Sequence, residues 1–116
     1  MKHVKNAHMG THLHVEVYNV PFEKLNDAKK IEQVCVDACK IEGVQVLNTY
    51  THQFDPYGVT VNLTLGESHL SCHTWPEIGC VSFDIFTCGA KNPRCVAFWV
   101  LQYFDTDDYV MNDYAR

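Results

Sequence analysis

Alternation of apolar and polar side chains with a period of two is the feature that most restricts how this chain can fold. Residues 59–65 (VTVNLTL) and 80–86 (CVSFDIF) alternate along their whole length, and residues 11–18 (THLHVEVY) alternate over most of theirs. A period of two sends successive side chains to opposite faces of a strand, so each segment predicts a strand with one buried face. Three further strands are predicted, at residues 44–50, 69–74 and 109–114.

Two segments have helical periodicity instead. Residues 25–42 carry one apolar stripe at helical spacing, formed by Ile31, Val34, Cys35, Ala38 and Ile41. Asn26 is expected to cap the N-terminus of this helix, and Gly43 is expected to follow its last turn. Residues 93–104 are apolar and place Pro93 in the first turn of a second helix.

The order of these elements, β-α-β-β-β-β-α-β, predicts an α+β fold. Strands that follow one another with few helical crossovers favour an antiparallel sheet, so we expect a two-layer α/β sandwich with two helices on one face. Residues 1–116 are expected to form a single domain, in which residues 1–10 are a loose arm without useful periodicity. The second face of the sheet then remains for a second subunit to cover.

Composition excludes several classes of partner. Fourteen acidic residues against nine basic ones give a formal charge of −5, which argues against binding to nucleic acid. No apolar run reaches the ~20 residues that span a membrane, and the N-terminus does not have the pattern of a signal peptide. We therefore expect a cytoplasmic protein, whose six cysteines are mostly free thiols.

Nucleophiles and proton carriers are concentrated in residues 66–89 (GESHLSCHTWPEIGCVSFDIFTCG). Two consecutive strands in this stretch can bring several of these side chains together across one face. The residues concerned are Ser68, His69, Ser71, Cys72, His73, Glu77 and Cys88.

This stretch resembles the cleavage and active-site region of the prokaryotic S-adenosylmethionine decarboxylases, which are pyruvoyl-dependent enzymes. The matching features are ESH at 67–69, HTWPE at 73–77 and DIFTCG at 84–89. The surrounding chain also fits, so the resemblance covers roughly residues 10–114.

The resemblance implies that the chain cuts itself between Glu67 and Ser68. In the family the serine hydroxyl attacks the preceding carbonyl, and the resulting ester eliminates to dehydroalanine, which hydrolyses with loss of ammonia. Residue 68 then becomes a pyruvoyl cofactor, whose ketone forms a Schiff base with the amine of the substrate and acts as an electron sink.

Other positions carry family roles by the same resemblance. His73 matches the histidine that moves protons during self-processing, and Cys88 matches the catalytic acid that returns a proton after CO₂ leaves. Thr60 stands where the family usually has a serine that assists processing, and it keeps the hydroxyl on a stiffer side chain.

The resemblance also implies the substrate and the assembly. Phe54 and Trp75 match two aromatic rings around the adenine of S-adenosylmethionine, with the tryptophan coming from the partner subunit, and Glu77 matches the carboxylate that binds the ribose hydroxyls. The expected product is the aminopropyl donor for spermidine synthesis. The expected assembly is a homodimer of processed two-chain units.

Two alternatives remain open on the sequence. The same pyruvoyl machinery can decarboxylate arginine or ornithine, although a simple amino acid needs no adenine clamp. A homologue that never self-processes and has no enzymatic activity is the other alternative, because Thr60 departs from the family pattern.

Metal binding is not predicted. Neither His12-x-His14 with His69-x3-His73 nor Cys35-x3-Cys39 makes the paired spacing of a zinc site. Among the cysteines, Cys35 is expected in the core and Cys39 at a flank or on the surface. Packing positions are expected for Cys72, Cys80 and Cys95.

Overall fold

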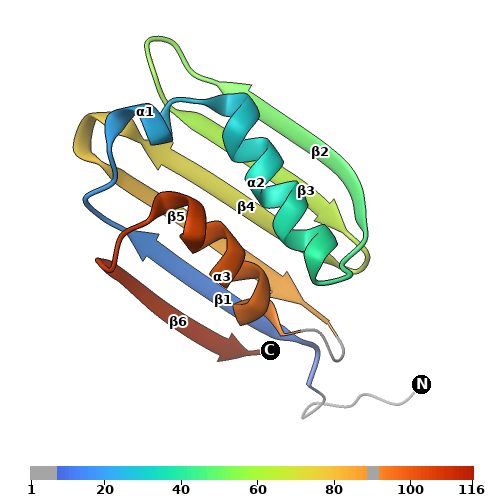
Figure 1. The fold of residues 1–116 in the computed structure, drawn as a ribbon. Coiled ribbons are helices and arrows are strands. Elements are labelled where there is room, and N and C mark those ends of the chain that lie inside the picture. Colours follow the sequence, from blue (N-terminus) through green and yellow to red (C-terminus); the bar gives the residue numbers. More distant parts are fainter. Residues whose placement is uncertain (1–7, 89–91) are drawn as a thin grey trace.

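One antiparallel sheet with two helices against one of its faces forms the molecule, as the sequence predicts (Figure 1). The structure is a computed structural model, and it describes residues 8–88 and 92–116. Within these residues the sheet has six strands in the order β2-β3-β4-β5-β1-β6. The strands are β1 Thr11–Val17, β2 Val46–Gln53, β3 Val59–Leu65, β4 Ser68–Trp75, β5 Cys80–Thr87 and β6 Tyr109–Ala115.

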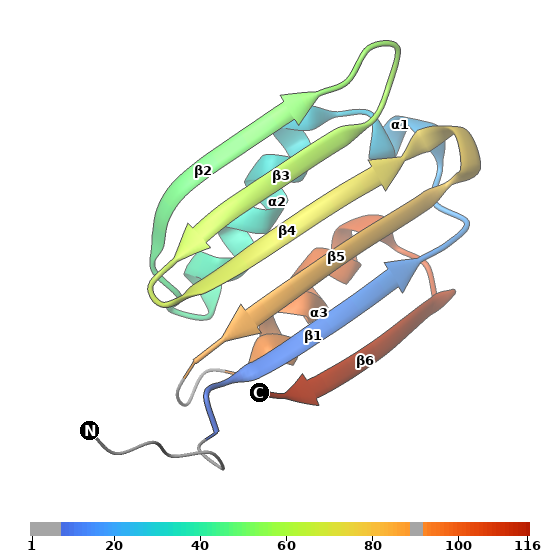
Figure 2. The same cartoon turned by 180° about the vertical axis from the view of Figure 1, so that it is seen from behind.

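The helices are α1 Phe22–Leu25, α2 Ala28–Ile41, α3 Pro93–Phe104 and the short 3₁₀ turn η1 Pro76–Ile78. The long helices α2 and α3 lie side by side on the same face of the sheet, whereas the other face carries no helix among the described residues (Figures 1 and 2). The predicted two-layer architecture is therefore confirmed.

The core lies between the sheet and the two helices. In β3 every second residue is buried, from Val59 to Leu65, and β5 buries Val81, Phe83 and Ile85 in the same way. The alternation in the sequence thus identifies the face that packs against the helices. It also identifies the opposite face, which we call the outer face, as the side that carries the polar residues of each strand.

The start of α2 differs from the prediction. Its N-cap is Asp27, whose side chain accepts a hydrogen bond from the backbone N–H of Lys30, and not Asn26. Asn26 instead ends α1, a short helix that the periodicity did not reveal, and its side-chain oxygen accepts a hydrogen bond from the backbone N–H of Gly58 at 3.0 Å. Gly43 follows α2 with a φ of 69°, as predicted.

The buried stripe of α2 is also rotated from the predicted one. Cys39 is fully buried, while Ile41 is 57% exposed and lies on the solvent side. The prediction of a flank or surface position for Cys39 was therefore wrong. The prediction of a packing position was wrong for Cys95, which is exposed, and right for Cys72, which is buried.

Residues 1–7 of the predicted loose arm lie outside the described residues. Its last two residues, Met9 and Gly10, make backbone hydrogen bonds with Arg116 at the end of the chain, so this part of the arm is held beside β6. No helix among the described residues is long and apolar enough to span a membrane.

Candidate functional site

Five of the eight predicted site residues surround one cavity of about 440 Å³. They are Phe54, Thr60, His73, Trp75 and Glu77. The two aromatic side chains are 48% and 44% exposed, so their rings are available to a ligand. We call these five residues the aromatic group.

The sheet register places the members of the aromatic group. Thr60 on β3 is paired directly with His73 on β4, and the Thr60 hydroxyl lies 3.0 Å from Nδ1 of His73. Trp75 stands two residues further along β4 on the same face, which puts its ring centroid 6.4 Å from that of His73. Glu77 follows in η1, the turn that begins with Pro76.

Phe54 is held by the closed loop between β2 and β3. Its backbone N–H donates to the carbonyl of Gly58 at 2.8 Å, and Gly58 adopts a φ of 114° that strongly favours glycine. The bond from the Gly58 N–H to Asn26 ties the same loop to the end of α1. The loop predicted from its Asp-Pro and Gly residues therefore forms one rim of the cavity.

Glu67, Ser68 and Cys88 lie together at the other end of the sheet, and we call them the cleavage group. The thiol of Cys88 donates a hydrogen bond to the carbonyl oxygen of Glu67, with the sulfur 2.9 Å from that oxygen. Ser68 and Cys88 line a second cavity of about 210 Å³ together with Gly66 and residues 43–45.

Glu67 has a strained backbone. Its φ of 58° lies in the left-handed region, where a non-glycine residue costs about 1 kcal/mol or more. The residue occupies the tight turn between β3 and β4, because Leu65 and Ser68 are paired across that turn. The bond that the motif marks for cleavage therefore follows directly on this strained residue.

Within one chain the structure does not bring the two groups together. Ser68 and His73 are five positions apart on β4, which corresponds to roughly 17 Å along an extended strand. Alternation also places Ser68 on the side of Leu70 and Cys72, which pack toward the helices, and His73 on the outer face. Each chain thus contains two separate halves of the predicted site.

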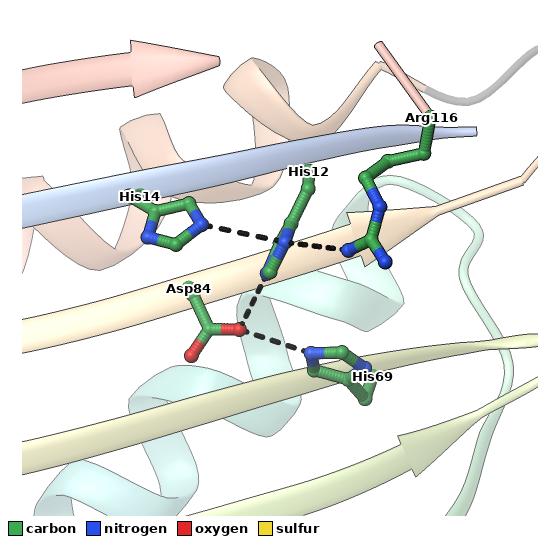
Figure 3. A network of polar contacts seen from close by, with 5 residues as sticks. All are labelled: His12, His14, His69, Asp84 and Arg116. Carbon is green, nitrogen blue, oxygen red and sulfur yellow. Dashed lines mark hydrogen bonds and ion pairs between the residues drawn. The ribbon is translucent and has the colours of Figure 1, made fainter. Parts of the chain in front are cut away.

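A cluster that the spacing of histidines did not reveal lies on the outer face (Figure 3). Asp84 is on β5, between His12 on β1 and His69 on β4, and its Oδ2 atom accepts hydrogen bonds from both imidazoles at 2.8 and 2.9 Å. Nδ1 of His12 faces Nη1 of Arg116 at 3.2 Å and Nε2 of His14 at 3.3 Å.

The cluster changes the acidity of its carboxylate. Burial alone would raise the pKa of Asp84, but hydrogen bonds and charge interactions with His12 and His69 outweigh it, so the pKa lies below its ordinary value. The alternation of β5 placed Asp84 on the outer face in advance. Only the pairing of β5 with both β1 and β4 shows that the two histidines meet there.

The comparisons with known proteins agree on one family. The family model described as S-adenosylmethionine decarboxylase matches residues 11–116. The S-adenosylmethionine decarboxylase proenzyme of Syntrophomonas wolfei subsp. wolfei is 38% identical over 109 residues, which are 93% of this chain and 86% of that protein. The proenzyme of Prochlorococcus marinus is 46% identical over 109 residues, 93% of this chain and 87% of that protein.

A solved structure supports the same fold. The adenosylmethionine decarboxylase from Aquifex aeolicus superposes with a TM-score of 0.88 at 24% identity, covering 94% of this chain and 91% of that one. At this level of identity the superposition speaks for the fold alone, and it agrees with the two-layer sandwich described above.

Proposed function

The chain belongs to the S-adenosylmethionine decarboxylase family, and from this membership we propose that residues 1–116 form a single domain that decarboxylates S-adenosylmethionine. The product is the aminopropyl donor of spermidine synthesis. The observation that carries the choice of substrate is the grouping of Phe54, Trp75 and Glu77 around one cavity. Two exposed rings suit an adenine, and a nearby carboxylate suits ribose hydroxyls, whereas arginine and ornithine offer neither group.

The cofactor of this reaction is a pyruvoyl group made from Ser68. The residues around the Glu67–Ser68 bond fit its formation, because Glu67 lies in a strained, exposed turn and a thiol already donates to its carbonyl oxygen. The Ser68 hydroxyl adds to this carbonyl, and the amide becomes an ester. Loss of the Cα proton of residue 68 then expels the Glu67 carboxylate, and hydrolysis of the dehydroalanine consumes water and releases ammonia.

Cys88 assists the first of these steps. Its S–H donates to the oxygen on which negative charge develops when the Ser68 hydroxyl adds to the carbonyl. A donor that is already aimed at this oxygen needs no rearrangement, which is the principle of an oxyanion hole. Relief of the left-handed conformation at Glu67 after cleavage favours the reaction in the same direction.

Thr60 and His73 supply proton transfer during processing, at the cleavage bond of the partner copy in the dimer proposed below. The hydroxyl of Thr60 lies within hydrogen-bond distance of the imidazole, so it can fix the orientation of the ring as a serine would. The larger side chain therefore keeps the contact on which processing depends. This geometry supports an active proenzyme over a homologue that never self-processes.

During turnover the pyruvoyl group supplies a carbonyl that withdraws electrons from the substrate as CO₂ leaves. Cys88 then carries the proton that returns to the substrate carbon, because its thiol lies beside residue 68 in the second cavity. The aromatic group holds the nucleoside part, and Glu77 orients the ribose.

A complete site requires two copies of the chain. The aromatic group and the cleavage group are separated along β4, and the outer face carries no helix among the described residues (Figure 2). A twofold dimer through the outer faces runs β4 of one copy against β4 of the other in the opposite sense. It thereby brings the aromatic group of one copy to the end of the partner's sheet, where Glu67 lies in the turn before β4 and Cys88 follows the end of β5.

The cytoplasm is the proposed location. All six cysteines are free in the structure, and three of them are buried in the core. Free thiols are usual where glutathione and thioredoxin keep proteins reduced.

One measurement tests the proposed function directly. Mass spectrometry of the purified protein should find chains 1–67 and 68–116, with the second chain beginning at a pyruvoyl group, and Ser68→Ala should remain one chain. Ser71→Ala, a serine on the same strand, is the matched control and should be cut normally. CO₂ release should then be much faster from S-adenosylmethionine than from arginine or ornithine. An uncut, inert protein, or a preference for either amino acid, contradicts the proposal.

A further inference from the structure

His12, His69 and Asp84 form a cluster outside the proposed site (Figure 3). One ligand atom from each residue lies within 4.8 Å of the other two. The three side chains come from β1, β4 and β5, which are adjacent strands of the sheet. Their positions are therefore set by paired backbone, and not by a flexible loop.

We propose that His12, His69 and Asp84 form a binding site for a zinc ion, completed by a water molecule. Two imidazole nitrogens and one carboxylate oxygen are a donor set that Zn²⁺ takes in tetrahedral sites with one open position. Imidazole ligands also favour zinc over magnesium or calcium, which prefer sites made of oxygen alone.

The three ligand atoms lie within 4.8 Å of one another and must draw together or apart until all three separations suit the ion. Zinc bonds of about 2.0–2.1 Å place neighbouring tetrahedral ligand atoms about 3.3 Å apart. The nitrogen–oxygen separations are now 2.8 and 2.9 Å, so each imidazole needs to withdraw by about half an ångström. In the single chain His69 has room for this movement, because its side chain is 46% exposed.

His14 supplies the hydrogen-bond acceptor that the zinc-ligating His12 needs for its other ring N–H. A ligating histidine donates its other ring N–H to an acceptor, which fixes its tautomer. Nε2 of His14 stands 3.3 Å from Nδ1 of His12 and can accept this proton. Arg116 only donates, so its contact with the same nitrogen belongs to the metal-free tautomer, and its exposed side chain swings away when the ion binds.

The site has a consequence for the cut protein. His12 belongs to the chain that ends at Glu67, whereas His69 and Asp84 belong to the chain that begins at residue 68. A bound ion would therefore join the two products through direct bonds. Zinc binding itself does not depend on cleavage, so the two proposals can be tested separately.

The experiment is a titration of the full-length Ser68→Ala chain, which stays uncut, with ZnCl₂ followed by calorimetry. We expect one ion per chain, and an affinity at least about tenfold lower in His69→Gln and in Asp84→Asn. The matched control is His52→Gln, which removes a histidine from β2 and should bind as tightly as the unaltered site. Circular dichroism checks the fold of each variant, and the exposed His69 gives a readout if Asp84→Asn does not fold.

A second measurement distinguishes metal binding at this site from metal binding at cysteine thiolates. Cobalt(II) in place of zinc gives a strong charge-transfer absorption with thiolate ligands, and a site of two histidines and one aspartate gives only weak d–d bands. Absence of binding, equal affinity in the variants and the control, or a thiolate spectrum overturns the proposal.

Discussion

The sulfur of Cys88 lies 2.9 Å from the carbonyl oxygen of Glu67 in the uncut chain. The two residues are 21 positions apart in sequence and meet because β4 and β5 are neighbours in the sheet. In the proposed function this one thiol serves two reactions in succession: it polarises the carbonyl before the chain is cut, and it donates a proton to the substrate afterwards.

This double role predicts two different effects of Cys88→Ala. Self-cleavage should still finish but become slower by about 10- to 100-fold, because one donor to the developing oxyanion is lost. Decarboxylation by the cut enzyme should fall by about 10²–10⁴-fold, since a general acid is lost. Cys95→Ala removes an exposed thiol from α3 and should change neither rate. Unchanged turnover in Cys88→Ala rules out the proton-donor role.

The contact between Thr60 and His73 predicts how processing depends on the hydroxyl. Thr60→Val keeps the shape of the side chain and removes the hydrogen bond, so self-cleavage should slow by about 100-fold, as expected when a proton-transfer group is mispositioned. Thr60→Ser should be cut at least as fast as the wild type. Thr64→Val, on the same strand, serves as the control. The measurement is the time course of cleavage on a denaturing gel. Normal cleavage of Thr60→Val contradicts the role of the Thr60 hydroxyl in processing.

Periodicity predicted the layers of this fold well because each strand has one buried face. The limits of β3 and α3 agree with the predicted segments, and β5 extends its segment by one residue. Local signals were weaker at α1, which has only four residues and no room for a periodic stripe. Because α1 gives no periodic signal, the sequence predicts Asn26 as the cap of α2, whereas Asn26 ends α1.

The candidate site shows where sequence reasoning stops. The family resemblance named every member of the aromatic and cleavage groups, but it did not show that β4 separates them. The cluster at Asp84 was missed because spacing along the chain does not reveal which strands are neighbours. Strand order, which places β1 between β5 and β6, depends on long-range pairing and not on local pattern.

The cysteines of α2 give a prediction for thiol chemistry. Burial raises the pKa of Cys39 to about 12, and the hydrogen bond with Cys72 together with burial raises the pKa of Cys35. An unfolded thiol has a pKa of about 8.5, so folding keeps these groups protonated and unreactive between that value and the folded one. The stability that this provides is complete below about pH 8.5 and is lost as the pH rises toward the folded value.

The measurement is labelling of the folded protein with a maleimide at about pH 7.5, followed by peptide mapping. Cys95 should react quickly because it is exposed, whereas Cys35 and Cys39 should react only after unfolding. Cys95→Ser should remove the rapid phase. Rapid labelling of Cys39 in the folded chain contradicts the buried position.

Substrate choice should depend on the aromatic group. Trp75→Ala removes one stacking partner, which is worth about 1–3 kcal/mol, so kcat/KM for S-adenosylmethionine should fall by about 5- to 150-fold. Glu77→Gln should cause a smaller loss, because a charge-assisted hydrogen bond to ribose becomes a neutral one. Trp99→Ala, which alters the other tryptophan on α3, is the matched control. Equal activity of wild type and Trp75→Ala means that the ring does not contact the substrate.

The separation of the two groups along β4 predicts that two impaired variants can restore each other. In a Cys88→Ala homodimer every site lacks the proton donor, and in a Trp75→Ala homodimer every site lacks the stacking ring. A hybrid dimer contains one site with both changes and one site with neither, because each site takes its cleavage group from one copy and its aromatic group from the other.

Coexpression of the two variants with different affinity tags, followed by tandem purification, isolates this hybrid. Its kcat/KM per dimer should reach roughly half the wild-type value, since one of the two symmetry-related sites is intact. The control is a hybrid in which one copy carries both changes and the other copy carries neither. There each composite site has one defect, so the activity should stay low although the number of substitutions is the same. If this control is the active hybrid, both groups serve a site within one chain, and the proposed twofold arrangement is wrong.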